Sequence, residues 1–318
     1  MTGGELLIAS ALDAIGGDPR WLPHPVRMIG RCIAWLDHRV RRVCRSGMSL
    51  RVAGICLAGG LPIAVYCLGA VVIDEVGRLA GWLGAALSIG LASTTLAARD
   101  LWDHVGAVDR PLDVGDLPAA RRAVALIVGR DTTELSESEV ARATVETVAE
   151  SAADGVIAPL VYLAIGGAPL ALAYKAVNTL DSMIGHRDEQ YTDFGWASAK
   201  LDDLMNWIPA RIAAILLIAG SGVTTGQLER LRNGWRVFCR DGSKHPSPNS
   251  GRPEAAMAGI LGVRLGGTNF YDGIAQDHPV LGQEGRGVEP QDIMAAAKIM
   301  VAASALGVCL AVGIRWLV

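Results

Sequence analysis

Five long apolar stretches alternate with polar segments along the chain. They cover residues 52–73, 79–98, 156–174, 207–223 and 299–318. The first three contain no charged residue, and the last two contain one arginine each, Arg211 and Arg315. Each is close to the roughly 20 residues that cross the hydrocarbon core of a bilayer. Buried helices of a soluble bundle usually keep a polar stripe. The pattern therefore predicts an all-α, polytopic membrane bundle whose polar helices and loops form the active site.

Two of the five stretches are irregular. Residues 156–174 contain Pro159, Pro169 and the pair Gly166-Gly167, and residues 207–223 contain Pro209 and Arg211. Such segments either span the membrane or enter and leave it on one side, and the sequence leaves this choice open. If both span, residues 175–206 and 224–298 lie on opposite sides. The larger number of arginines in 224–298 favours spanning. The other three stretches are expected to be plain membrane anchors.

The polar segments suggest an orientation. Residues 5–15 form an apolar run too short to span. Arginines then accumulate ahead of the first long stretch, which is typical of the cytoplasmic side; they are Arg20, Arg27, Arg31, Arg39, Arg41, Arg42, Arg45 and Arg51. Residues 99–155 return to the cytoplasm, with a polar loop over 100–116 and a short helix over 117–128. We expect one domain, residues 1–318, in the cell (inner) membrane, with its catalytic face in the cytoplasm.

Composition agrees with this assignment and excludes some functions. The mean hydropathy is +0.33, and 19% of the residues are charged, fewer than in a typical soluble domain. The net charge of −3 argues against a nucleic-acid-binding surface. None of the six cysteines forms a CxxC pair, so neither zinc nor a disulfide framework is expected. The start of the chain lacks the basic region of a cleaved signal peptide.

A helix predicted over 137–153 carries the first group of candidate residues. Ser136 to Glu139 reads as a capping box. Glu139, Arg142, Glu146 and Glu150 share one face of this helix, and Asp154 follows at its end. Such a face is either a solvated surface or a carboxylate cluster for Mg²⁺, which favours a few carboxylates together with substrate phosphates.

Two further groups border the irregular stretches. Lys175, Asn178 and Ser182 form a helical stripe beside Asp181, and ionisable groups so close to an apolar segment suggest function. Asp202 and Asp203, with Asn206, could bind a hard cation, or they could complement a helix dipole. Arg211, inside the next stretch, could bind phosphate. Lys175 could also simply reach toward the membrane surface.

A Gly-, Ser- and Asn-rich loop at 241–254 leads into a helix of small residues. Backbone N–H groups and the positive end of that helix would suit a phosphate, although the loop lacks Walker A spacing. Its candidate residues are Lys244, His245, Ser247, Asn249 and Arg252. Near the start of the chain, Asp18 and His24 lie in segments that otherwise read as turns.

These blocks, in this order, resemble the adenosylcobinamide-phosphate synthase family of cobalamin biosynthesis (the CobD/CbiB family). The matching stretches are 17–20 with 23–26, 129–131 with 141–150, 154–160, 174–183, 194–196, 202–211, and 245–249 with Glu254, 258–259 and 265–267. The resemblance covers nearly the whole chain. There is one departure: Ser151-Ala152-Ala153 stands where the family pattern has Asn-Thr-Ser.

The resemblance implies an ATP-dependent ligase that joins adenosylcobyric acid to (R)-1-amino-2-propanol phosphate, or to aminopropanol, through an amide bond. It implies ATP as co-substrate, Mg²⁺ as cofactor, and association with membrane lipid. Other corrinoid-pathway enzymes or a second copy are further candidate partners. Because ATP is cytosolic, exposure of one polar region to the far side of the membrane would be awkward for this reaction, and the choice between spanning and re-entrant segments stays open.

Roles follow residue by residue from this reaction. The catalytic candidates are Lys175, Asp181, Arg211 and His245, with His245 as acid–base residue. The substrate- or phosphate-binding candidates are Asp18, His24, Asn178, Lys244, Ser247, Asn249 and Arg252. The metal candidates are Glu146, Glu150, Asp154, Asp202 and Asp203.

Three other functions compete with this one. A membrane prenyltransferase also uses Mg²⁺, but its Asn-x-x-x-Asp spacing is missing because Asn178 and Asp181 are three apart. A transporter would not need the Ser-Pro-Asn loop. A non-catalytic regulatory relative is kept open by the change at Ser151–Ala153.

Overall fold

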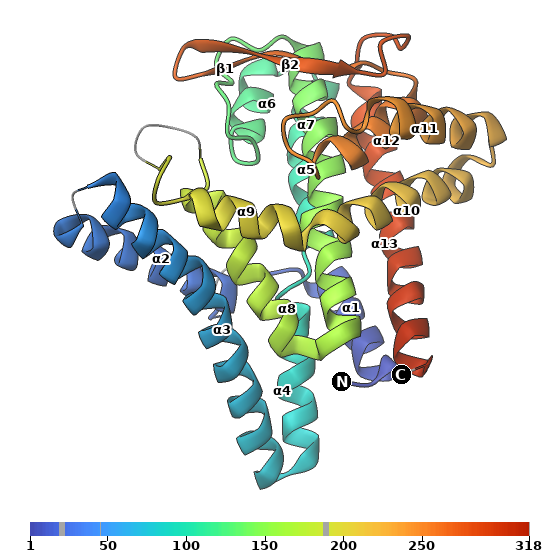
Figure 1. Cartoon of the computed structure of the whole chain (residues 1–318). Helices are drawn as coiled ribbons and strands as arrows, with labels where there is room; N and C mark the ends of the chain where they lie inside the picture. Colours follow the sequence, from blue (N-terminus) through green and yellow to red (C-terminus); the bar gives the residue numbers. More distant parts are fainter. Residues whose placement is uncertain (19–22, 45, 187–190, 318) are drawn as a thin grey trace. The chain divides into compact units, whose positions relative to one another are not determined.

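The computed structural model describes residues 1–18, 23–44, 46–186 and 191–317, and its elements are mostly helical (Figure 1). In chain order they are α1 (Gly3–Gly16), α2 (Pro25–Val43), α3 (Gly47–Leu79), α4 (Gly81–Ser93), α5 (Ala98–Asp113), α6 (Leu117–Val124), α7 (Glu137–Ser151), the π-helix η1 (Ala152–Ile157), α8 (Ala158–Ile184), α9 (Trp196–Met205), α10 (Trp207–Thr225), α11 (Leu228–Asp241), α12 (Gly251–Leu261), β1 (Leu265–Tyr271), β2 (Ile274–Leu281) and α13 (Gln291–Leu317). The predicted helical bundle is confirmed.

The chain folds into two compact units. Unit 1 contains residues 1–97, 158–206 and 308–318, and unit 2 contains residues 98–157 and 207–307. Each unit is built from segments that are far apart in sequence, so neither is a contiguous domain. That the whole chain acts as one domain stays a prediction.

Each of the five predicted apolar stretches overlaps one of the candidate membrane spans of the described residues, which are Gly47–Leu79, Gly81–Asp113, Glu137–Ile184, Trp207–Thr225 and Gln291–Leu317. In α3, which has a mean hydropathy of 2.2 over its most apolar window, only 17% of that window is buried inside the protein. Its exposed side chains include Ile55, Ile63, Leu68 and Val71. In water such a surface would be unfavourable, whereas lipid tails solvate it. The protein is therefore a multi-pass membrane protein.

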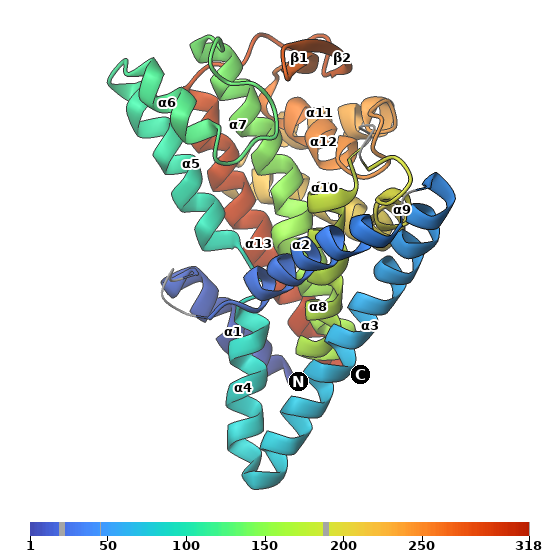
Figure 2. The same cartoon turned by 90° about the vertical axis from the view of Figure 1, so that its left-hand side faces the viewer.

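A helical hairpin of α3 and α4 forms one part of unit 1 (Figures 1 and 2). Gly77 and Gly84 let the two helices approach closely, because a Cβ on Gly84 would lie 2.7 Å from the Cα of Gly77. The short helix α1 packs on α4 and turns Leu7, Ile8 and Ile15 outward. With 14 residues it is too short to span, as predicted.

The prediction of a polar loop over residues 100–116 is wrong, because the helix α5 occupies Ala98–Asp113. Its buried residues Leu101, Val105, Val108 and Leu112 recur at spacings of three and four, which is the pattern of an amphipathic helix. Several charges on the opposite face hide this pattern in the sequence. The short helix expected next is confirmed as α6, Leu117–Val124.

The apolar stretch 156–174 does not run straight. At Gly167 the backbone adopts φ 69° and ψ −164°, a region open almost only to glycine. The rings of Tyr162 and Tyr174 stack with centroids 4.8 Å apart, although twelve residues along a straight helix would separate them by about 18 Å. The chain therefore reverses at Gly167, and the two arms of α8 run back along each other, as in a re-entrant segment (Figure 1).

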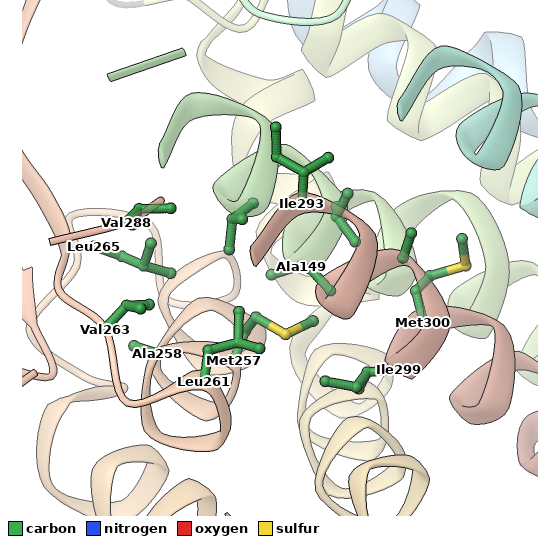
Figure 3. Packing of buried hydrophobic residues seen from close by; sticks show 14 of the residues in the cluster. Ala149, Met257, Ala258, Leu261, Val263, Leu265, Val288, Ile293, Ile299 and Met300 are labelled. Atoms are coloured by element: carbon green, nitrogen blue, oxygen red, sulfur yellow. The ribbon is translucent and has the colours of Figure 1, made fainter. Parts of the chain in front are cut away.

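Unit 2 is organised around a buried apolar core shared by α7, α12 and α13. Figure 3 shows Ala149, Met257, Ile293 and Met300 within this core. Helix α10 runs across α13 and not alongside it (Figure 1), which favours the re-entrant alternative for residues 207–223.

A two-stranded antiparallel hairpin, β1–β2, completes unit 2 and was not predicted. Its turn residues Asp272 and Gly273 both have positive φ, 50° and 75°. Asp-Gly is a strong sequence signal for such a tight turn, so the hairpin could have been recognised. A bulge between Leu265 and Gly267 shifts the register near the start of β1.

Candidate active site

In unit 1, the second arm of α8 and the helix α9 bring together a set of polar side chains. We call these residues the α8–α9 cluster: Tyr174, Lys175, Asn178, Asp181, Asp202 and Asn206. Asp202 and Asn206 are one helical turn apart, and Tyr174 and Asn178 are likewise separated by four residues on α8. Helix periodicity therefore places Tyr174 and Asn178 on one face of α8, and Asp202 and Asn206 on one face of α9.

Asp202 lies at the centre of this cluster. Its Oδ2 accepts a hydrogen bond from Asn206 Nδ2 at 3.0 Å, and its Oδ1 accepts one from Asn178 Nδ2 at 3.5 Å. Burial, followed by the neighbouring carboxylate of Asp181, raises the pKa of Asp202 to about 7. Two carboxylates held close together favour a bound cation or a shared proton.

The other members are also held by hydrogen bonds. Tyr174 Oη donates to Asn206 Oδ1 at 2.9 Å, and Lys175 Nζ donates to Asn178 Oδ1 at 3.0 Å. Gly185 leaves space for Asp181, because a Cβ there would lie 2.0 Å from Asp181 Oδ1. The predicted residues Lys175, Asn178, Asp181 and Asp202 are therefore neighbours.

Asp203 was predicted to act beside Asp202, but the two carboxylates point in different directions. Successive residues of a helix are rotated by about 100°. Asp203 Oδ2 accepts from Lys200 Nζ at 3.1 Å on a more open side of α9. A metal site that uses the carboxylates of both Asp202 and Asp203 would require one of these side chains to change its direction.

In unit 2, Glu146 on α7 is the centre of a second polar group. It accepts hydrogen bonds from Arg130, from Arg142 at 3.3 Å, and from the backbone N–H of Gly266 at 2.8 Å. Both arginines also donate to Asn269 Oδ1 on β1. We call Arg130, Arg142, Glu146 and Asn269 the hairpin anchor. Because both Glu146 oxygens are engaged, a metal ion would have to displace one of these donors.

Glu150 and Glu254 lie near this anchor. Glu150 Oε1 accepts from Ser250 Oγ at 2.8 Å. Glu254, in the first turn of α12, is buried, and burial followed by the charges of Glu146 and Glu150 raises its pKa well above the ordinary value. Residue spacing alone does not single out Glu254, because a single acidic residue at a helix start usually complements the helix dipole.

His245 is fixed by its loop and by the β-hairpin. Its Nδ1 accepts the backbone N–H of Ser247 at 3.0 Å, so the neutral ring carries its proton on Nε2. Its ring stacks on His278 of β2 with centroids 5.8 Å apart. Burial, the largest cause, lowers the pKa of His245. A neutral imidazole with Nε2–H can donate a hydrogen bond to an anionic oxygen.

The predicted phosphate loop is largely satisfied by its own groups. Ser247 Oγ accepts from the backbone N–H groups of Asn249 and Ser250 at 3.3 and 3.2 Å. Lys244 Nζ pairs with Asp241 at 2.6 Å. The Arg252 guanidinium lies over the Phe238 ring at 5.7 Å. Of these residues, Arg252 is the best placed to bind an anion, since Lys244 is already neutralised.

The remaining predicted residues are Arg211, Asp154, Asp18 and His24. Arg211 folds back on its own helix, donating to the Trp207 carbonyl oxygen, with its guanidinium 4.0 Å from the Trp207 ring centroid. Asp154 lies in η1, one of the π-helical turns that often occur at functional sites. Asp18 and His24 of unit 1 come together, with 2.9 Å between Oδ2 and Nε2; Arg20 lies outside the described residues.

Comparison with known proteins decides the family. A family model described as CobD/Cbib protein matches residues 6–300. The chain is 47% identical to "Cobalamin biosynthesis protein CobD" of Geobacter metallireducens over 311 residues, which is 97% of this chain and 95% of the relative. It is 44% identical to "Cobalamin biosynthesis protein CbiB" of Salmonella arizonae over 98% of this chain and 97% of the relative. The chain belongs to the CobD/CbiB family. No solved structure matches it.

This family membership establishes a role in cobalamin biosynthesis. Within the described residues of this CobD/CbiB protein, no three His, Cys, Asp or Glu side chains converge in a way that could hold a metal ion. The metal assignments of Glu146, Glu150, Asp154, Asp202 and Asp203 therefore stay predictions. Arg130 joins the candidate residues because its contact with Glu146 is visible only in the fold, and Arg142 joins them through its contacts with the β1 strand.

Proposed function

We propose that this protein ligates (R)-1-amino-2-propanol phosphate, or aminopropanol, to adenosylcobyric acid in an ATP-dependent reaction. The observation that carries the proposal is the match to the CobD/CbiB family over residues 6–300. The polar groups of α7, α8, α9 and α12 support it, because they offer carboxylates, amides and arginines beside membrane helices.

The proposed reaction has two steps, formation of an acyl phosphate and then formation of the amide. A carboxylate oxygen of the corrinoid attacks the γ-phosphorus of ATP, the bond to the β–γ bridging oxygen breaks, and ADP leaves. The amine then attacks the resulting acyl phosphate, losing a proton to a base as inorganic phosphate departs and the amide forms. The protein's task is to orient both substrates and to stabilise anionic oxygens.

Within the α8–α9 cluster, Asp181 and Asp202 are the residues that would hold Mg²⁺. Their mutual repulsion fits a cation, since Mg²⁺ in ATP-using enzymes commonly binds one or two carboxylates and takes its other ligands from phosphates and water. Bound there, Mg²⁺ would neutralise phosphate charge. Lys175 and Asn178 are placed to orient oxygens of the same substrate.

In unit 2, the groups near His245 are assigned to anion and proton handling. The Nε2–H of His245 and the guanidinium of Arg252 would donate to phosphate or carboxylate oxygens. Glu150 and Glu254 are the carboxylates near His245 and the hairpin anchor, and either could accept the proton that the amine loses. Because ATP is cytosolic, the proposed catalytic face is the cytoplasmic one.

A direct assay tests the function. Purified protein in detergent is incubated with adenosylcobyric acid, aminopropanol or its phosphate, ATP and Mg²⁺, and the corrinoid products are identified by mass. We expect the mass of the amide product, ADP in equal amount, and no product without ATP. AMP and pyrophosphate would instead indicate an acyl adenylate. Absence of product with both amines, from folded protein, would reject the ligase proposal.

Complementation and variants make the test sharper. A strain blocked at cobinamide formation and fed cobyric acid should be rescued by this protein, with cobinamide feeding as the positive control. Rescue by cobinamide alone would favour a non-catalytic relative. Asp181→Ala and Asp202→Ala should abolish ligation while the protein remains in the membrane. Asp74→Asn, whose side chain is 62% exposed in the α3–α4 hairpin, is the matched control.

A further inference from the structure

Helix α2 carries a basic outer face that no part of the proposed reaction uses. Its inner face is apolar: Ile29 and Ile33 pack into the cluster formed by Leu180, Ile184 and Phe194. The exposed face contains Arg27, Arg31, Arg39 and Arg42 together with Trp35 and Met28. Trp35 and Met28 are 56% and 59% exposed, so the face combines positive charge with large apolar side chains.

The charge on this face is not balanced within the helix. Asp37 is the only carboxylate of α2, and it is used on another side, where it pairs with Arg41 at 2.6 Å and accepts from Tyr191 Oη at 3.1 Å. Arg41 itself stacks on Tyr191 and Phe194. Arg41 is thus built into the fold, whereas the side chains of Arg31, Arg39 and Arg42 are exposed.

The position of α2 along the chain places its C-terminal end close to the start of a candidate membrane span. Three residues separate its last residue, Val43, from Gly47, where the apolar helix α3 begins. Fully extended, such a link reaches only about 14 Å. Nearby aromatic–arginine pairs, Arg39 over Trp35 and Arg51 over Trp196, have the composition of a membrane–water interface.

We propose that the outer face of α2 binds the headgroups of anionic phospholipids. Four arginines on one helix face match a negatively charged lipid surface, and Trp35 and Met28 would enter the headgroup layer between them. The contact would fix the height of α2 in the interface, and with it the α8 arm on which α2 packs.

The experiment measures how lipid stabilises the full-length protein in dodecyl maltoside. Phosphatidylglycerol or phosphatidylcholine is added, and the melting temperature is followed as a function of lipid concentration. We expect a larger increase in melting temperature with phosphatidylglycerol than with phosphatidylcholine. This difference should disappear as NaCl is raised from 50 to 500 mM, because the Debye length falls from about 14 to about 4 Å. Equal effects of the two lipids would overturn the proposal and would point to a protein partner.

Variants identify the face. Replacing Arg27, Arg31, Arg39 and Arg42 by glutamine should weaken the apparent affinity for phosphatidylglycerol by about fivefold per arginine, and replacement by lysine should restore most of it. The control removes four exposed arginines elsewhere, Arg99, Arg122, Arg232 and Arg236. If the control loses the lipid effect equally, or the α2 variant keeps it, the proposal is wrong. The lysine variant and the salt titration retain their meaning if the glutamine variant does not fold.

Discussion

Arg315, near the end of the chain, donates hydrogen bonds to the carbonyl oxygen of Leu163, with Nη2 at 3.1 Å and Nε at 3.4 Å. Leu163 lies on the first arm of α8, four residues before the reversal at Gly167. The usual helical donor to this carbonyl is the N–H four residues later, which is where helical geometry ends. The single charge of the last apolar stretch therefore has a structural role: it satisfies the backbone at the tip of a re-entrant hairpin.

Replacing Arg315 by glutamine should destabilise unit 1. A charged donor to a buried carbonyl contributes about 1.5–3 kcal/mol, so the melting temperature in detergent should fall clearly. Arg78→Gln is the control, because Arg78 is 66% exposed and its ion pairs with Asp74 and Glu75 are solvated. Equal losses from both variants would show that the Leu163 contact contributes nothing special.

Gly167→Ala should also destabilise the hairpin, because its φ of 69° with ψ of −164° is strained for any residue with a Cβ, by about 1–3 kcal/mol. Gly60→Ala is a matched control in α3, where no atom lies within 4 Å of an added Cβ. That change should be neutral or stabilise by about 0.5–1 kcal/mol. Thermal unfolding of both variants measures the difference, and a neutral Gly167→Ala would contradict the reversal at this residue.

Asp202 should make stability pH-dependent. Its folded pKa of about 7 lies above the ordinary value, so the folded state holds a proton that the unfolded state has lost, and stability decreases as pH rises toward 7. Asp202→Asn should flatten this slope, and its melting temperature relative to the parent protein should increase from pH 5 to pH 8. The scan is run with EDTA. A parallel displacement of the two curves at all pH values would argue against ionisation of Asp202.

Glu146→Gln should loosen the β-hairpin. It leaves Arg130 and Arg142 without their carboxylate, and breaking such a buried pair costs about 3–5 kcal/mol. Trypsin cleavage after Arg264, the exposed residue just before β1, should become faster. Glu284→Gln, at a 70% exposed carboxylate, should leave the cleavage rate unchanged. Unchanged cleavage in Glu146→Gln would show that the anchor does not hold β1.

Asp241→Asn tests a different ion pair. Asp241 is buried, and hydrogen bonds from Arg240, then from Lys244 and the N–H of Gly282, hold its pKa below the ordinary value. Its contribution to stability is complete above the unfolded pKa of about 4 and is lost as pH falls through the lower folded value. The variant should therefore melt well below the parent at pH 7, with the gap narrowing toward pH 3. A gap independent of pH would indicate a packing effect.

Parts of the candidate site could be predicted from sequence because they follow helix periodicity. Asp202 and Asn206, or Lys175 and Asn178, are neighbours wherever their helices form. Helix periodicity could not single out Glu254 or Arg130. The carboxylates near Glu254 are Glu146 and Glu150, which lie 100 or more residues earlier in the chain. Arg130 donates to Glu146 from the loop that precedes α7. The hairpin anchor joins α7 to β1 across 120 residues between Glu146 and Gly266.

The sequence by itself determined that this is a multi-pass helical membrane protein with polar groups beside its apolar segments. Apolar length and the residue spacing of helices are local properties, and the tertiary structure did not change them. Only the tertiary structure decided that residues 156–174 turn back at Gly167 and that both carboxylate oxygens of Glu146 accept hydrogen bonds from arginines. It likewise decided that Asp202 and Asp203 face different surroundings. These properties depend on which distant groups pack against each segment, and no local pattern encodes those partners.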